Sequence, residues 1–155
     1  MGAQLVEGVR SALGVTRAEA TARVLALLER VGIADPKRTF DSYPHQISGG
    51  MAQRVLIAGA VASRPKLLIA DEPTTALDVT VQAEILDLLR DLQSELDMAI
   101  LLVTHNFGVV ADLCDRIAVM QNGVIVESGT AAEVFAHPTH ELSLIHISEP
   151  TRPRL

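Results

Sequence analysis

Two segments in the first part of the chain have apolar residues at helical spacing. Residues 16–31 carry charged side chains between four apolar positions that share one helix side: Val24, Leu27, Leu28 and Val31. Gly32 ends this predicted amphipathic helix, and a polar connection through Asp41 and Pro44 follows. Ser48 is a good N-cap residue for a second helix that ends near residues 63–65. Its expected buried face consists of Met51, Val55, Leu56 and Ala60.

The pattern changes at residues 67–70, an apolar run that stops abruptly at Asp71 and Glu72. A short run bounded in this way is typical of a fully buried parallel strand. Residues 78–95 again have apolar positions at helical spacing, and residues 98–103 form a second apolar run that predicts another buried strand. The order strand, helix, strand predicts a right-handed crossover unit of an α/β fold.

Shorter elements are predicted beyond this unit. Residues 106–113 favour a short helix and residues 116–120 a third strand. Asn122-Gly123 is typical of the tight turn of a hairpin, which continues into a strand at residues 124–127. Thr130 can cap a last helix, and the sequence contains no internal repeat.

Composition excludes several classes of protein. With 155 residues, 48% of them apolar, the chain is long enough for one domain with a core. A formal charge of −6 argues against a nucleic-acid partner, and 3% aromatic residues leave little material for base stacking. The single cysteine, Cys114, fits a reducing compartment and is expected to be a packing residue. No apolar run approaches the roughly 20 residues that span a bilayer.

Two acids at the end of a predicted strand are the first candidate site. Open α/β sheets place their catalytic groups at strand ends. Asp71 would hold Mg²⁺, usually through water, and Glu72 could polarise an attacking water for phosphoryl transfer. The alternative interpretation is a strand that ends in two solvated acids.

Two further features lie on either side of these acids in the sequence. Ser48, Gly49 and Gly50 open a helix, where glycines let backbone N–H groups approach an anionic phosphate; they would otherwise be an ordinary cap with loop glycines. His105 follows the second apolar run, so we expect it at the same sheet edge as Asp71 and Glu72, unless it is a structural histidine.

Together these segments resemble the nucleotide-binding subunits of ABC transporters. Residues 47–51 resemble the signature motif, residues 67–72 the Walker B strand, residues 76–78 the D-loop, and His105 the switch histidine. Residues 43–51 and 71–78 are similar to the ATPase subunits of dipeptide and oligopeptide importers. The resemblance covers residues 4–138 and implies the C-terminal part of a P-loop NTPase (RecA-like) core with the helical signature subdomain.

The resemblance implies ATP and Mg²⁺ as cofactors and divides the roles between two subunits that face each other head to tail. Asp71 would position Mg²⁺, Glu72 would act on the hydrolytic water, and His105 would contact the γ-phosphate of nucleotide held by the same chain. Nucleotide held by the partner would be contacted by Ser48, Gly49, Gly50, Met51 and Gln53. Asp78 would lie in the D-loop at the interface. Met51 stands where the broader family usually has glutamine. A methionine at this position resembles the peptide-importer branch of the family.

One family motif is not found in the sequence. No G-x-x-x-x-G-K-[ST] string occurs, so the backbone cradle and lysine that hold the β- and γ-phosphates are not present. We therefore expect a truncated subunit without the phosphate-loop strand and with negligible ATP hydrolysis of its own. In the family that strand lies between those corresponding to residues 100–103 and 117–120, so its loss predicts exposed apolar faces and poor solubility.

Three regions are expected: a partial helical signature subdomain at residues 1–64, a catalytic core at residues 65–138, and a tail at residues 139–155. Residues 143–155 resemble translated sequencing-adapter read-through, so the tail is expected to be non-native. His137, His140 and His146 have no spacing that fixes a metal site.

The resemblance also implies partners and a location. They are a second, identical or different, ATPase subunit, transmembrane permease subunits and, indirectly, a periplasmic or lipid-anchored substrate-binding protein, at the cytoplasmic face of the bacterial inner membrane. Alternative functions are an importer ATPase for nickel or another small solute, and a catalytically dead dimerisation or regulatory module. A chromosome-maintenance ATPase is disfavoured because residues 4–48 contain no long coiled coil.

Overall fold

The computed structural model describes residues 1–148. By its internal contacts the chain divides into two compact units, Met1–Leu101 and the part from Leu102 onward. Each unit is therefore described by itself.

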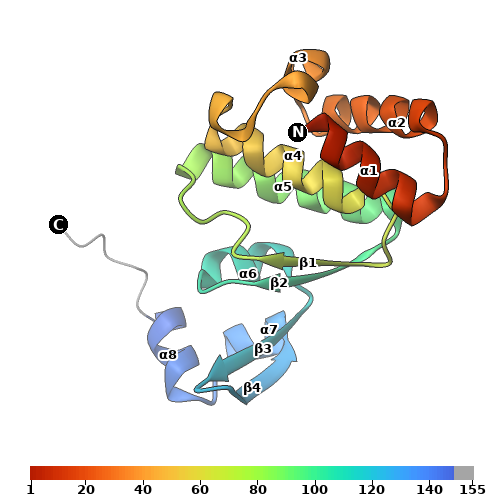
Figure 1. Cartoon of the computed structure of the whole chain (residues 1–155). Coiled ribbons are helices and arrows are strands. Elements are labelled where there is room, and N and C mark those ends of the chain that lie inside the picture. Colours follow the sequence, from red (N-terminus) through yellow and green to blue (C-terminus); the bar gives the residue numbers. More distant parts are fainter. Residues whose placement is uncertain (149–155) are drawn as a thin grey trace. The chain divides into compact units, whose positions relative to one another are not determined.

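The first unit begins with helices (Figure 1): α1 (Gly2–Leu13), α2 (Arg17–Arg30), α3 (Pro36–Asp41), the single 3₁₀ turn η1 (Pro44–Gln46) and α4 (Gly49–Val61). Both predicted helices are confirmed. The prediction missed α1, and the polar connection after Gly32 contains α3, which the prediction did not include.

Helix α2 begins with a capping box. The Thr16 hydroxyl accepts a hydrogen bond from the Glu19 backbone N–H at 3.3 Å, and the Glu19 carboxylate accepts from the Thr16 backbone N–H at 2.8 Å. These bonds satisfy backbone donors that have no partner within the helix. The Thr16 hydroxyl also donates a hydrogen bond to the Glu19 carboxylate at 2.7 Å, and this bond, followed by the one from the Thr16 backbone N–H, lowers the pKa of Glu19.

Helices α2, α4 and α5 (Val79–Leu96) supply most of the core of this unit. Its fully buried side chains include Val24, Leu28, Val61, Ile85 and Leu89. The predicted buried face of α4 is wrong at Leu56 and Ala60, which are exposed. Helix α4 contacts α1, α2 and α5, so its buried surface is set by three neighbours and not by one stripe.

Strands β1 (Leu67–Asp71) and β2 (Ala99–Val103) are neighbours in a two-stranded sheet, joined in sequence by α5. The predicted strands are confirmed, but the prediction that they are fully buried is wrong. In β1 only Leu68 and Ala70 are buried, whereas Leu67 and Ile69 are exposed. The reason is that the helical core, to which Leu68 belongs, covers one face of the strand only.

The second unit contains α6 (Phe107–Leu113), β3 (Arg116–Gln121), β4 (Val124–Thr130), α7 (Ala131–Ala136) and α8 (Glu141–Ser148). Strands β3 and β4 form the predicted antiparallel hairpin, with a register shift between Val119 and Met120. Asn122 and Gly123 both have positive φ angles, 52° and 80°, as a tight hairpin turn requires. The Thr130 cap is confirmed, but α7 is not the last helix, because α8 follows it.

Among residues 1–148, no helix is both long enough and apolar enough to cross a membrane.

Candidate functional site

The start of α4 presents the glycine-led segment predicted from the sequence. Ser48 is the N-cap residue, and its hydroxyl accepts a hydrogen bond from the Met51 backbone N–H at 3.2 Å. Ser48 and Gly49 are exposed, and Gly50 is half-buried. The first N–H groups of a helix have no acceptor within it, and the helix dipole favours negative charge there. This end of α4 is therefore suited to an anion.

Met51 and Gln53 differ from the glycines in their surroundings. The Met51 side chain is partly buried and packs against the core of the first unit. Gln53 is half-buried and lies just after the first helical turn. That turn is closed by the Ala52 backbone N–H, which donates to the Ser48 carbonyl at 2.9 Å. Met51 thus anchors the start of α4, and its contact with nucleotide stays a prediction.

The two acids lie where the sequence predicted, at the end of β1. Asp71 is the last residue of the strand and is exposed. Glu72 follows with a φ of 49°, a left-handed conformation that costs free energy in a residue other than glycine. An exposed carboxylate such as that of Asp71 suits Mg²⁺, because this ion keeps several water ligands and takes the rest of its coordination shell from one or two carboxylates and the substrate phosphates.

A turn after the strand fixes the Glu72 side chain. The Thr75 hydroxyl donates a hydrogen bond to the Glu72 carboxylate at 2.8 Å, and the Thr75 backbone N–H donates to the Glu72 carbonyl at 3.1 Å. Sequence reasoning did not find Thr75. Its only signal was its position three residues after Glu72, the spacing of a turn closed by a hydroxyl.

Asp78 ends the same turn and caps α5. Its carboxylate accepts a hydrogen bond from the Val81 backbone N–H at 3.0 Å, so the side chain has a local structural role. Its place at an interface between subunits stays a prediction. The residue is exposed.

The starts of α4 and α5 lie close together. A Cβ atom built on Gly49 would be 3.7 Å from Leu77 Cδ2, and one on Gly50 would be 2.8 Å from Val81 Cγ1. The first unit therefore brings the glycine-led helix start next to the end of the turn that carries Glu72. His105, exposed and one residue before the α6 N-cap Asn106, belongs to the second unit. Its convergence with Glu72 on one ligand stays a prediction.

Glu127 and Cys114 also have shifted pKa values. Glu127 has a pKa lowered to about 2, first by the Ser143 hydroxyl and then by the backbone N–H of Thr139, which donates at 2.8 Å. The Glu127 carboxylate thereby binds residues around the start of α8, an interaction that no pattern in the sequence predicted. Burial, and secondly the charge of Asp115, raise the pKa of the Cys114 thiol, so the reactive thiolate is disfavoured.

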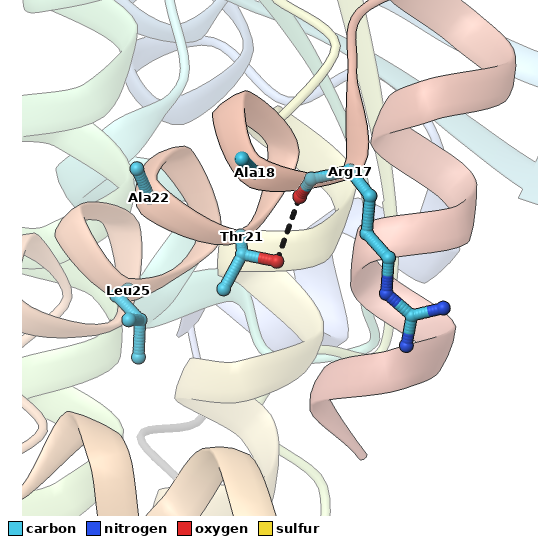
Figure 2. A pocket seen from close by; sticks show the side chains of 5 residues that line it. All are labelled: Arg17, Ala18, Thr21, Ala22 and Leu25. Atoms are coloured by element: carbon cyan, nitrogen blue, oxygen red, sulfur yellow. Dashed lines mark hydrogen bonds between the residues drawn. The ribbon is translucent and has the colours of Figure 1, made fainter.

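A shallow hollow along the outer side of α2 contains none of the predicted site residues (Figure 2). Arg17, Ala18, Thr21, Ala22 and Leu25 line it. All five come from one helix, and the Thr21 hydroxyl donates back to the Arg17 carbonyl at 2.8 Å. In the described part of the chain, no three His, Cys, Asp or Glu residues are grouped so that they could hold a metal ion by themselves.

Comparison with known proteins defines the class. Residues 3–75 match the family described as ABC transporter. The solved structure of cbiO1 from Clostridium perfringens, part of the ABC transporter complex cbiONQ, superposes with a TM-score of 0.68 and 38% identity. It covers 79% of this chain and 48% of that one. The ATP-binding cassette MJ0796 was solved as a dimer in a post-hydrolysis state with ADP and Pi. It superposes with a TM-score of 0.64 and 32% identity, covering 76% of this chain and 49% of that one.

These matches place the chain among the ABC-type ATP-binding proteins. It is 53% identical over 140 residues to the dipeptide transport ATP-binding protein DppD of Haemophilus influenzae, covering 90% of this chain and 42% of that protein. It is 51% identical over 140 residues to the oligopeptide transport ATP-binding protein OppD of Bacillus subtilis, covering 90% and 39%. The chain thus spans less than half the length of these relatives.

Proposed function

We propose that the chain carries the signature, Walker B and D-loop segments of an ATPase subunit that drives the import of dipeptides or oligopeptides. The observation that carries the proposal is the packing in the first unit of Gly49 and Gly50 against Leu77 and Val81. This contact joins the anion-binding end of α4 to the turn that begins at Glu72. The names of the relatives, which include dipeptide, oligopeptide and peptide transport proteins, favour peptides over nickel as cargo.

In this proposal the two acids have different tasks. Asp71, exposed at the strand end, would hold Mg²⁺, usually through water, and the ion would supply charge that neutralises the phosphates. Glu72 accepts a proton from the attacking water. Thr75 keeps the Glu72 carboxylate on one side of the turn through its 2.8 Å hydrogen bond. His105 would contact the γ-phosphate of nucleotide held by the same chain.

The exposed start of α4 serves the opposite subunit. Ser48, Gly49 and Gly50 contact the γ-phosphate of nucleotide held by that partner, with Met51 and Gln53 supporting them. Asp78 lies beside the same interface. The functional division is a signature region at residues 1–64 and a catalytic region at residues 65–138, and residues 139–155 have no part in it.

The proposed assembly has the ATPase subunits as a pair on the cytoplasmic face of the bacterial inner membrane. They bind transmembrane permease subunits, which receive peptide from a substrate-binding protein outside the membrane. A dimer is supported by the dimeric MJ0796 structure, and a complex by the description of cbiO1 as part of one.

A chimaera tests this function. In the dipeptide transport ATP-binding protein of H. influenzae, the matching 140-residue segment is replaced by its counterpart from this chain. We expect the chimaera to hydrolyse ATP and to restore dipeptide uptake in cells that lack the native subunit. A chimaera that hydrolyses ATP but restores no peptide uptake would contradict the importer assignment.

Glu72→Gln in the chimaera tests the proposed base. Removing the water-activating carboxylate should lower turnover by roughly 100-fold while ATP binding is kept, because general base catalysis contributes about 10²–10⁴. Steady-state hydrolysis and nucleotide binding are measured side by side. The control is Glu29→Gln, an equally conservative change at an exposed glutamate of α2. Normal turnover in Glu72→Gln would remove this residue from the mechanism.

A further inference from the structure

Gly50 of α4 lies close to α5. A Cβ atom there would lie 2.8 Å from Val81 Cγ1, closer than side-chain carbons approach, whereas a Cβ on Gly49 would be in ordinary contact with Leu77 at 3.7 Å. The other Val81 atoms are farther away, with Cγ2 at 3.9 Å and Cβ at 4.0 Å. Of the three atoms nearest to such a Cβ, only Val81 Cγ1 is closer than ordinary contact, so this methyl group is the one that opposes alanine at position 50.

A second link lies one helical turn further along both helices. The Arg54 guanidinium donates to the Glu84 carboxylate at 2.7 Å and to the Val31 carbonyl at 2.6 Å. Arg54 is four residues after Gly50, and Glu84 is three residues after Val81, so each pair shares one face of its helix. The Arg54 side chain is 17% exposed and that of Glu84 54%, so solvent screens the pair on the Glu84 side only in part, while Arg54 is held from the other side by the Val31 carbonyl. We call these four residues the α4–α5 seam.

The seam lies in the first two turns of both helices, directly after their caps. Ser48 caps α4 and Asp78 caps α5, each through a side-chain oxygen that accepts a backbone N–H of its own helix. Because each cap is fixed to its helix and the helices contact each other at two points, the seam opposes changes in the spacing between Ser48 and Asp78.

We propose that Val81 and the Arg54–Glu84 pair are positioning residues, which hold the signature start and the D-loop end as one rigid body so that both reach the opposite subunit together. This inference rests on the function proposed above. According to this inference, position 50 favours glycine because Val81 of the same chain is so close, in addition to any contact that Gly50 makes with nucleotide.

The test is a double-mutant cycle in the chimaera. Gly50→Ala should lower kcat for ATP hydrolysis by at least tenfold, with KM for ATP changed less than twofold, because the helix start is displaced while nucleotide held in cis is not. Val81→Ala removes both Cγ atoms and leaves its Cβ 4.0 Å from the new methyl group. Combining Gly50→Ala with Val81→Ala should therefore recover most of kcat.

A second cycle pairs Gly50→Ala with Leu77→Ala, which removes a neighbour of Gly49 and opens no space at Gly50. No recovery is expected from it. If Val81→Ala gives no recovery either, the new methyl group acts on nucleotide directly and the positioning role is wrong. If both cycles give equal recovery, the effect is not specific to the contact between Gly50 and Val81, and the proposed role of the α4–α5 seam is wrong as well.

Thermal unfolding of the same variants separates this inference from the proposed function. The seam predicts that Gly50→Ala lowers the unfolding midpoint of the chimaera and that Val81→Ala offsets part of the loss. Coupling in stability without coupling in kcat overturns the positioning role and leaves the proposed function standing. A chimaera that folds but never hydrolyses ATP overturns the proposed function, and the stability cycle then decides whether the contact exists.

Discussion

At the scale of single residues, the candidate site combines groups placed by their neighbours in sequence with groups placed by the path of a turn. Asp71 and Glu72 lie at the end of a strand, and Ser48 caps a helix, as their neighbours in sequence indicated. Two details were not predictable. The left-handed φ of Glu72 and the hydroxyl of Thr75 on its carboxylate depend on the path of a turn, which no hydrophobic pattern encodes.

The hydrogen bond from the Thr75 hydroxyl to the Glu72 carboxylate leads to a prediction about catalysis. A hydrogen bond to a charged group contributes about 1.5–3 kcal/mol, and less where solvent competes, as at this exposed threonine. Thr75→Val in the chimaera removes the hydroxyl and keeps the shape, so we expect kcat to fall by about 3- to 10-fold with little change in KM for ATP. Thr75→Ser restores the hydroxyl and should recover the loss. Equal kcat in the valine and serine variants would show that this hydrogen bond does not serve catalysis.

At the scale of elements, the pattern of apolar residues predicted most helices and strands but not which faces they bury. Long periodic segments such as α2 and α5 were recognisable because one stripe meets one core. Helix α4 has three neighbours, and the exposed Leu56 shows that its buried surface cannot be derived from its own sequence. Helix α1 was missed although Val6 and Val9 are buried and Gly14 ends it with a φ of 66°.

The capping box of α2 provides a prediction about stability. Thr16→Ala removes the hydroxyl that accepts the Glu19 N–H, and loss of an N-cap costs about 1 kcal/mol. We expect the free energy of unfolding, measured in the chimaera with urea, to fall by that amount. Thr21→Ala, a matched change inside α2 whose hydroxyl only bonds back to Arg17, should change it by no more than about 0.5 kcal/mol. Similar losses in both variants would mean that the cap contributes nothing specific.

At the scale of the molecule, the chain exposes strand faces that a self-sufficient α/β domain would cover. Strands β1 and β2 form one two-stranded sheet, and β3 and β4 form another. On β1, Leu67 is 51% and Ile69 63% exposed, directly beside the buried Leu68 and Ala70. Short sheets with apolar faces and free edges favour association between chains.

This arrangement predicts that the 155-residue chain associates in solution and that the exposed face of β1 is a cause. Leu67→Thr combined with Ile69→Thr keeps residues that favour strands but removes apolar surface, so the monomer fraction in sedimentation velocity should rise. Leu56→Thr is the matched control, because Leu56 is 66% exposed but lies on α4 and not on a strand. It should change association less than the strand variant does. An unsubstituted chain that sediments as a compact monomer and unfolds cooperatively would contradict the prediction, because the exposed apolar face of β1 would then not cause association.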